Sequence, residues 1–230
     1  KKINHTDNPR FPQELRDDME LMRETDYDAY LHIYEGEPVA NDSMAVIKSQ
    51  WIRAAVGAHI ALNIAISGSK IGGFDVADDG PDKNALVWRH GFVAVGAEEW
   101  PDKDPNSSAS HAHSRCLELC IETLHYDDIG VGAGAKGQFR QLQDAELQSG
   151  SRGVQRVQAI GWTASAGVDN PEYEYKPGKK NKDMFLNKKA QAWWIVADKF
   201  RNTFNATSGK PHDPENLISL SSSIDNLEKL

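Results

Sequence analysis

Residues 72–91, GGFDVADDGPDKNALVWRHG, place an aspartate in the middle of an apolar run that has the character of a β-strand. Asp75 is followed by more acidic residues and a Gly-Pro turn, and a second strand-like run then begins. A further turn at His90 and Gly91 leads into a third such run. This stretch predicts three consecutive strands, and it raises the question of why an acid lies in the first of them.

The rest of the chain predicts helices that alternate with strands. Apolar spacing and turn residues indicate helices over 109–124, 135–147 and 187–204, and strands near Asp127 and over 151–165. The order β-β-β-α-β-α-β-α is typical of an α/β fold whose five-stranded mixed sheet is covered by helices on both faces. A serine in the loop before the first of these helices is expected to cap it.

Two regions lie outside this alternation. Residues 12–30 and 45–62 have helical spacing, and we assign them to an N-terminal helical extension, residues 1–66, that precedes a core domain, residues 67–230. Residues 166–187 are rich in Pro, Gly and Lys, which is typical of a long loop that carries function or moves.

Composition is ordinary for a soluble globular protein, with 39% hydrophobic and 26% charged residues. No stretch approaches the roughly eighteen apolar residues that a membrane span needs, so no membrane partner is expected. A net charge of −8 argues against a uniformly basic surface but allows basic patches. Two cysteines make no disulfide framework and suggest a reducing compartment. Because the chain starts at Lys1 and ends in a polar segment, we expect a fragment of something longer.

Asp75 and Asp127 are the candidate chemical centre. If the first and fourth strands are neighbours in the sheet, these two acids lie side by side at its edge. Two carboxylates at such a short separation repel each other, and a divalent cation between them offsets this repulsion. Carboxylate oxygens suit Mg²⁺ or Mn²⁺, and two such ions about 3.5–4 Å apart can hydrolyse phosphodiesters. The alternative is that Asp75 merely ends a strand and Asp127 opens a turn.

Three stretches carry a family resemblance: GGFDVADDGPDKNALVWRHG, YDDIGVGAGAKGQFR and NKKAQAWWIVADKF. Together they resemble the C-terminal nuclease domain of the large terminase subunit of tailed bacteriophages. Upstream, DNPRFPQEL, YLHIYEGEPV and IKSQWI resemble the segment that joins the ATPase domain of that family to its nuclease. The resemblance covers most of the chain in the order of the family.

The resemblance implies a ribonuclease H-like fold and a metal-dependent endonuclease that cuts concatemeric viral DNA to genome length during packaging. It also implies Mg²⁺ or Mn²⁺, with two ions in the complete site. Its partners would be double-stranded DNA, the terminase ATPase domain, the small terminase subunit and the portal, in the host cytoplasm. By position, Asp75 matches the first-strand acid of the family and Asp127 the fourth-strand acid.

The match is incomplete at its C-terminal end. The family carries a third acid in a late helix, and no matching stretch occurs before Leu230, so the third ligand is expected beyond that residue. Asp198 is a helical acid that does not match the motif. Asp128 is assigned to the metal together with Asp75 and Asp127. Asp78, Asp79 and Asp128 could instead be outer groups or solvated acids of turns.

A lysine cluster is the candidate DNA-binding surface. Within fourteen residues the chain places six lysines with only Asp183 opposing them, and these are Lys176, Lys179, Lys180, Lys182, Lys188 and Lys189. Such a cluster can neutralise phosphates without reading sequence, although a solvated loop with no partner is the alternative. Lys136 and Arg140, at the start of the helix after Asp127, are expected nearer the metal and could also reach a phosphate.

Several other patterns have simpler explanations. Residues 132–137 spell G-x-G-x-x-G, but the next strand supplies no acid for a dinucleotide ribose, so the glycines are expected to serve a tight turn beside Asp127. Lys136 is followed by Gly137, which excludes a Walker A loop. Trp193 and Trp194 are expected in core or interface positions rather than stacked on bases.

A zinc site is also weighed. His113, Cys116 and Cys120 fall roughly on one face of a predicted helix, with His111 nearby, but a single helix seldom supplies a whole tetrahedral site. Buried helical cysteines are the simpler explanation.

Three functions therefore stand. The first is the metal-dependent endonuclease. The second is a non-catalytic module that clamps DNA or docks on the motor or portal, and the third is a hydrolase or resolvase of the same fold that acts on branched or hybrid nucleic acids.

Overall fold

The computed structural model describes residues 11–25, 27–36, 45–77, 81–102, 104–130, 132–148 and 156–224. The chain divides into two compact units, Lys1–Arg53 and Ala54–Leu230. Among the described helices, none is long and apolar enough to cross a membrane.

The first unit contains two helices, α1 (Gln13–Thr25) and α2 (Tyr27–Ile33), where the sequence predicts one helix over 12–30. The Tyr30 and Tyr34 rings stack with centroids 6.0 Å apart, and Tyr34 also meets Phe11 edge-on at 6.2 Å. A helix α3 (Ser49–Ala55) crosses the boundary between the units.

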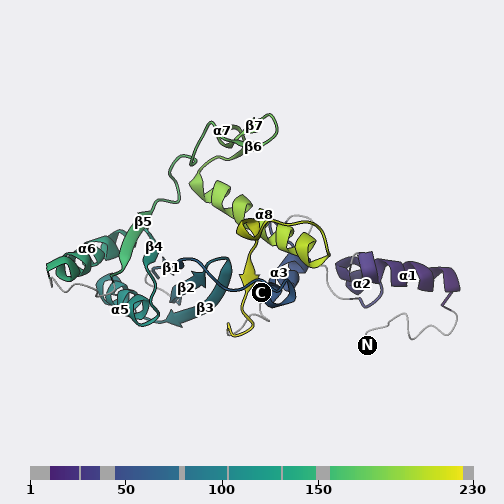
Figure 1. Ribbon diagram of the computed structural model, residues 1–230, viewed down its shortest axis with the longest axis horizontal. Coiled ribbons are helices and arrows are strands. Elements are labelled where there is room, and N and C mark those ends of the chain that lie inside the picture. The colour runs from purple at the N-terminus through teal and green to yellow at the C-terminus, as the bar shows by residue number, and fades with distance from the viewer. Residues whose placement is uncertain are drawn as a thin grey trace. The chain divides into compact units, whose positions relative to one another are not determined.

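The second unit is built on a six-stranded mixed sheet (Figure 1). Its strands lie in the order β5-β4-β1-β2-β3-β8, and their bounds are β1 (Lys70–Asp75), β2 (Asn84–His90), β3 (Val93–Trp100), β4 (Thr123–Asp127), β5 (Gln158–Trp162) and β8 (Ser219–Leu220). The strands β1, β2 and β3 are antiparallel neighbours, whereas β4 pairs in parallel with both β1 and β5. The predicted mixed α/β sheet is confirmed, with β8 as a short sixth strand that pairs in parallel with β3.

One face of the sheet packs against α5 (Pro105–Glu118) and α6 (Gly132–Gln148). The buried cluster joins strand residues to small and aromatic residues of these helices, and its members include Phe74, Leu86, Leu124, Tyr126, Ala109, Ala112, Cys116, Ala135 and Phe139. The helices can approach the sheet closely because several of their contact residues are alanines. This core fixes the face toward which alternate strand residues point.

Two local predictions about α5 are wrong. Its N-cap is Asp104, whose carboxylate accepts the amides of Asn106 and Ser107, rather than a serine. The helix also ends at Glu118, so Cys120 lies beyond it in the left-handed backbone region, with a φ of 57°. Carboxylates and hydroxyls cap helices about equally well, which is why composition alone does not choose between Asp104 and the serines that follow.

The insertion between β5 and the last long helix contains regular secondary structure. It contains β6 (Glu174–Lys176), β7 (Lys179–Lys180) and α7 (Asn181–Met184), and β6 pairs with β7 as an antiparallel hairpin. The Asn181 amide side chain donates to the carbonyl oxygens of Asp169 and Asn170, and the side chain itself is buried. Such hydrogen bonds give partners to backbone carbonyl groups that are not paired in a helix or sheet.

The helix α8 (Lys188–Thr207) links the two edges of the sheet (Figure 1). At its start, the Lys188 and Lys189 amides donate to carbonyl oxygens of the loop after β5, at 2.8 and 3.0 Å. Near its end, the Thr203 hydroxyl donates to the Ile218 carbonyl oxygen at 2.8 Å, beside β8. The helix therefore spans from the β5 edge to the β8 edge. A short helix, α4 (Ala58–Ala61), and a 3-10 turn, η2 (Pro214–Asn216), pack near its C-terminal half.

Candidate metal centre

The register of the sheet brings Asp75 and Asp127 together. The strands β1 and β4 are parallel, and their paired residues run from Ile71 opposite Thr123 to Phe74 opposite Tyr126. Asp75 and Asp127 are the next residues in this register, and each is the last residue of its strand. Neighbouring strands lie about 4.8 Å apart, so the two acids occupy adjacent positions at one edge of the sheet.

Both acids lie on the face of the sheet opposite α5 and α6. Phe74 and Tyr126 are buried in the cluster with these helices, and strand residues alternate between faces. Gly73 lies on the same face as Asp75, and a Cβ added to it would meet no atom within 4 Å. Its partner on β2, Val87, is 47% exposed. The face that carries the acids is therefore open beside them.

The two carboxylates have few partners of their own. The Asp127 Oδ1 atom accepts the Ile129 backbone amide at 3.2 Å, which orients this side chain. Within the described parts of the chain, neither Asp75 nor Asp127 forms an ion pair with a basic side chain. Over the same residues, no group of three His, Cys, Asp or Glu side chains could hold a metal. The site thus offers two uncompensated carboxylates to a cation.

Asp128 is not brought to this pair. Its Oδ1 atom accepts the Thr163 hydroxyl at 2.6 Å, and its Oδ2 atom lies 3.9 Å from the Lys136 ammonium of α6. Its Cβ also lies over Gly161 of β5, and a Cβ added to Gly161 would be only 2.8 Å from it. Burial raises the pKa of the Tyr126 hydroxyl, and the charge of Asp128 adds to this. Asp128 thus belongs with the α6 side, away from the face that carries Asp75 and Asp127.

The other candidate acids are engaged or lie outside the described residues. Asp198 of α8 accepts the Tyr175 hydroxyl of β6 and lies 2.6 Å from the Arg201 guanidinium. Burial, and then the hydrogen bond to Asp198, raise the pKa of Tyr175. Asp198 therefore fastens the hairpin to α8. Asp78 and Asp79 fall outside the described residues.

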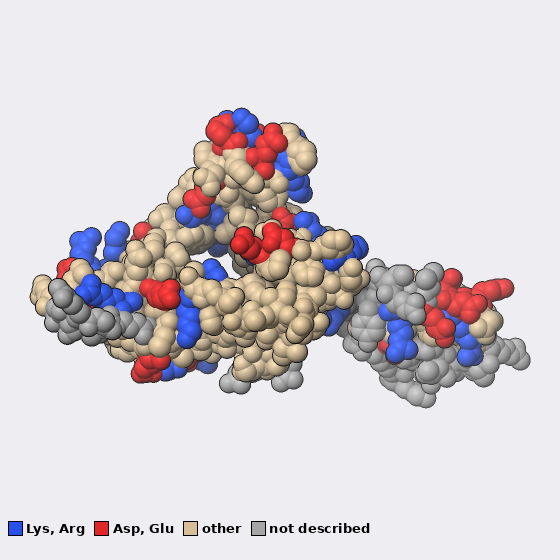
Figure 2. Space-filling view, in the orientation of Figure 1, with Lys and Arg blue, Asp and Glu red and all other residues tan. Residues whose placement is uncertain are grey.

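Acids that precede the lysine run partly neutralise it. The carboxylate of Glu172 lies 2.7 Å from the Lys180 ammonium and 2.5 Å from the Lys182 ammonium. The carboxylate of Asp169 lies 3.1 Å from the Lys188 ammonium. Hydrogen bonds from the two lysines hold the pKa of Glu172 at about 2. In Figure 2, acidic and basic side chains are accordingly interleaved over the segment that carries β6, β7 and α7. Three lysines remain without an ion pair among the described residues, and these are Lys176, Lys179 and Lys189.

Lys136 and Arg140 both lie on α6 and are exposed. They belong to the helix-covered side of the sheet, where Lys136 approaches Asp128, rather than to the face of Asp75 and Asp127.

His125 is a residue that the sequence argument missed. It lies two residues before Asp127 on the same strand, opposite Gly73, and so on the open face. Burial lowers the pKa of its imidazole, and the charges of Arg89 on β2 and Lys188 on α8 lower it further. A neutral imidazole with two cations nearby therefore adjoins the acid pair. The only sequence signal for His125 is that it lies two residues before Asp127, so that both side chains share one face of the strand.

The glycines after Asp127 serve the turn. A Cβ on Gly132 would clash with the Asp127 carbonyl oxygen, and Gly130 has a φ of 63°, which other residues rarely adopt. The expected tight turn beside Asp127 is therefore present at Gly130 and Gly132, whereas Gly134 and Gly137 of the G-x-G-x-x-G run lie within α6.

The residues weighed for zinc lie apart. Cys116 is buried in the core, where burial raises the pKa of its thiol to about 12, and Cys120 is exposed beyond the helix. The His113 Nε2 atom instead lies 3.0 Å from Oε1 of Glu146 on α6, and the His111 Nε2 atom lies 2.9 Å from Oε1 of Glu98.

The two tryptophans of α8 are not core residues, because Trp193 is 53% and Trp194 is 44% exposed.

The buried His113 predicts a pH dependence of stability. Burial lowers the pKa of His113, although the nearby Glu146 opposes this, so the unfolded chain binds a proton more readily. Stability is thus complete above the unfolded pKa of about 6.5 and falls as pH decreases below it, by up to about 1.4 kcal/mol per pH unit. Urea unfolding of the wild type and of His113→Gln at pH 7.5 and 5.5 measures this. We expect a smaller loss in the variant, and an equal loss in both would assign the effect to other groups, such as His125.

Comparison with known proteins identifies the family. No family model matches the chain, and no curated protein matches it. The nuclease domain of the large terminase subunit gp2 of bacterial virus Sf6 is 29% identical, with a TM-score of 0.70 over 81% of this chain and 79% of that chain. A mutant of that domain, solved with manganese and beta-thujaplicinol, is 30% identical with the same TM-score and coverage. The same mutant, solved with calcium, is 29% identical with a TM-score of 0.69 over the same shares. The chain therefore belongs to the family of ribonuclease H-like nuclease domains of phage large terminase subunits.

Proposed function

We propose that this chain is a Mg²⁺- or Mn²⁺-dependent DNA endonuclease that cuts concatemeric viral DNA to genome length. The observation that supports this is the adjacent placement of Asp75 and Asp127 at the ends of parallel neighbouring strands, on an open face. Two adjacent strand-end carboxylates with no basic partner among the described residues are suitable ligands for a divalent cation.

The donor set fits such a cation. Carboxylate oxygens are the ligands that Mg²⁺ and Mn²⁺ prefer, and a site that leaves room for water and phosphate suits hydrolysis. The relative from bacterial virus Sf6 was solved with manganese and with calcium. We infer that Asp75 and Asp127 hold the metal here, and that the complete site takes two ions with help from a further carboxylate.

The chain's own residues have separate tasks in this reaction. Asp75 and Asp127 bind and position the ions. The Ile129 backbone amide donates to Oδ1 of Asp127 and so orients that oxygen toward the turn after β4. Gly73 leaves room on the open face for a DNA backbone. The ions would polarise the scissile phosphodiester and activate water for in-line attack. His125 and Lys188 present donors near the same face, where phosphate oxygens would lie.

The lysines supply contacts to DNA in this proposal. Lys179 and Lys189 have no ion pair among the described residues, whereas Glu172 occupies Lys180 and Lys182. The substrate is double-stranded DNA, and Lys136 and Arg140 would meet the duplex at the edge of the sheet. The ATPase domain, the small terminase subunit and the portal are the further partners, in the host cytoplasm.

The charges of the hairpin predict opposite effects on DNA affinity. We expect Lys179→Gln with Lys189→Gln to weaken duplex binding and to lower the salt slope by about 2, because each lysine lost removes about one phosphate contact. Glu172→Gln should tighten binding, since it releases Lys180 and Lys182. Fluorescence anisotropy with a labelled duplex at several salt concentrations measures both. Lys210→Gln is the control, and a Lys179 and Lys189 double variant that behaves like it would exclude these two lysines from the DNA surface.

The test of the proposed function is nicking of supercoiled plasmid. We expect relaxed circles in Mn²⁺ or Mg²⁺ and none in EDTA. Activity that persists in EDTA would contradict a metal-dependent reaction.

A second candidate, a module that clamps DNA or docks on the motor without cutting, is favoured by one observation. No group of three metal-binding side chains occurs among the described residues. Duplex binding with no metal-dependent nicking would support this candidate. Cleavage confined to branched or hybrid substrates would instead support a resolvase-like enzyme.

A further inference from the structure

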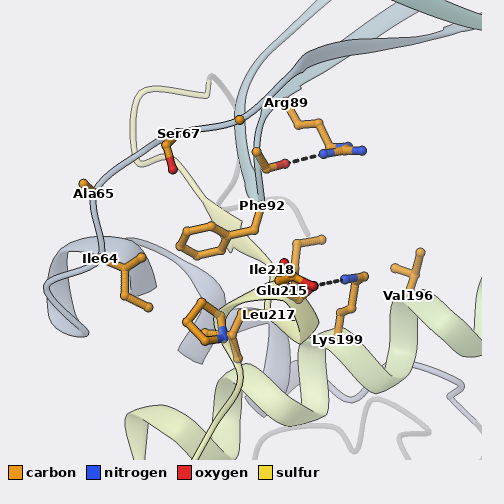
Figure 3. Close-up of a pocket in the computed structure, with 13 residues that line it drawn as sticks. Ile64, Ala65, Ser67, Arg89, Phe92, Val196, Lys199, Glu215, Leu217 and Ile218 are labelled. Carbon is orange, nitrogen blue, oxygen red and sulfur yellow. Dashed lines mark hydrogen bonds between the residues drawn. The ribbon is translucent and has the colours of Figure 1, made fainter.

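A cavity lies beneath α8, at the opposite end of β2 from the acids. It has a volume of about 630 Å³ and is bounded by the segment 64–68, the turn between β2 and β3, α8 and the segment 214–218 (Figure 3). All of these segments belong to the second unit. They are tied together, because the Ser219 amide donates to the Phe92 carbonyl oxygen at 3.0 Å and Thr203 holds Ile218. The cavity is therefore a built feature of the fold.

Two cations line this cavity, and among the described residues their hydrogen-bond partners are carbonyl oxygens. The Lys199 ammonium donates to the Glu215 carbonyl oxygen at 2.7 Å, and the Arg89 guanidinium donates to the Gly91 carbonyl oxygen, as Figure 3 shows. Neither forms an ion pair with a carboxylate among the described residues. Burial and then the charge of Arg89 lower the pKa of Lys199, while Asp213 and Glu215 partly oppose this. An anion placed between the two cations would relieve their repulsion.

The remaining walls are apolar. Phe92 directs its ring into the cavity, and the other apolar lining residues include Ile64, Val196, Leu217 and Ile218 (Figure 3). The volume falls in the range of about 300–1,000 Å³ that is typical of sites for small molecules. A ligand that fits has a flat ring to lie against Phe92 and an anionic group that can take two charged donors.

We propose that this cavity binds a nucleoside monophosphate, with the phosphate between Arg89 and Lys199 and the base against Phe92. The same chemistry occurs in a free mononucleotide and in the 5′-phosphorylated end of a DNA strand. The site goes beyond the proposed nuclease function, because it uses none of the residues of the metal centre.

The cavity is also separate from the acids in space. Arg89 is paired with Ile71, which lies four residues before Asp75 on β1. Four residues of strand extend about 13 Å, so both sites share one face of the sheet but cannot share one phosphate.

The experiment is calorimetric titration of the chain with deoxyadenosine 5′-monophosphate in EDTA, so that no metal bridges the ligand to the acids. We expect saturable binding, and binding about tenfold weaker or more for deoxyadenosine, because charge-assisted hydrogen bonds are lost. Arg89→Met and Lys199→Met should each weaken binding by a similar factor, whereas Lys210→Met should leave it unchanged. Equal affinity for nucleotide and nucleoside, or full affinity in both cationic-site variants, would overturn the proposal.

Further variants remove the remaining ambiguities. Glu215→Gln removes an acid beside the phosphate position, so it should tighten binding several-fold, and this gain cannot come from misfolding. The double variant Asp75→Asn with Asp127→Asn should bind as the wild type does, and a loss there would place the ligand at the acids and overturn the proposal. Inorganic phosphate should compete weakly, since it lacks the base. Competition as strong as that of the nucleotide would overturn the role of Phe92.

The source of the ligand is decided by competition with a short oligonucleotide. Displacement by the 5′-phosphorylated form and not by the 5′-hydroxyl form would assign the site to strand ends. Displacement by neither would assign it to free mononucleotides, and in either result the site for a nucleoside phosphate stands.

Discussion

Asp75→Asn and Asp127→Asn are each expected to reduce Mn²⁺-dependent plasmid nicking by about a hundredfold or more. Each change keeps the shape of the side chain and removes the charge that binds the cation, and a metal ion supplies several kcal/mol of transition-state stabilisation. In EDTA the same changes should leave the free energy of unfolding unchanged or slightly higher, because they end the repulsion between two adjacent carboxylates. Gel assays of nicking, together with urea unfolding, measure both effects.

Asp128→Asn is the matched control, since it makes the same change one residue further along the chain. Asp128 accepts the Thr163 hydroxyl and lies beside Lys136, on the α6 side. We expect nicking by this variant to stay within about tenfold of the wild type, because its partners hold Asp128 away from the face that carries the acid pair. If Asp128→Asn is as inactive as Asp75→Asn, then Asp128 is a metal ligand, as the sequence predicts. If both strand-end variants nick normally, the proposed mechanism is excluded.

The sequence located each acid at the end of an apolar run, and the pairing of Asp75 with Asp127 followed only on the condition that the first and fourth strands are neighbours. The structure meets this condition, because β1 and β4 pair in parallel. The face on which Asp128 lies could not be predicted. It is decided by Thr163 and by the missing side chain of Gly161, which come from β5 and the loop that follows it.

Contacts outside the short windows of sequence explain the misjudged charge and helix boundaries. Asp169 and Glu172 neutralise three lysines only because a hairpin folds the insertion back on itself. The predicted helix over 45–62 breaks at Gly57, with a φ of 67°, and the neighbouring Val56 forms a bridge with Leu220 of β8. The hydrophobic pattern of a short window carries no information about strand partners that lie more than a hundred residues away.

The position of the two acids depends on one aromatic residue of α6. Phe139 is buried, and its ring lies 4.6 Å from that of Tyr126 and 6.1 Å from that of Phe74. These two partners immediately precede Asp127 and Asp75 on their strands. One side chain from the helix side thus packs against both strand ends that carry the acids on the other face. Packing in the core and geometry in the site are therefore coupled through the sheet.

Phe139→Ala should consequently lower the free energy of unfolding by about 3–5 kcal/mol, the usual cost of removing a buried aromatic ring and leaving a cavity. In conditions where the variant is still folded, its nicking rate should fall as well, because Phe74 and Tyr126 lose the ring that fixes them. Urea unfolding and plasmid nicking at low temperature measure the two effects. Gln141→Ala, an exposed change on the same helix, should alter stability by less than about 0.5 kcal/mol. A loss below about 1 kcal/mol in Phe139→Ala would mean that the core closes around the cavity, and normal nicking by a destabilised variant would show that the strand ends are held in place by the sheet alone.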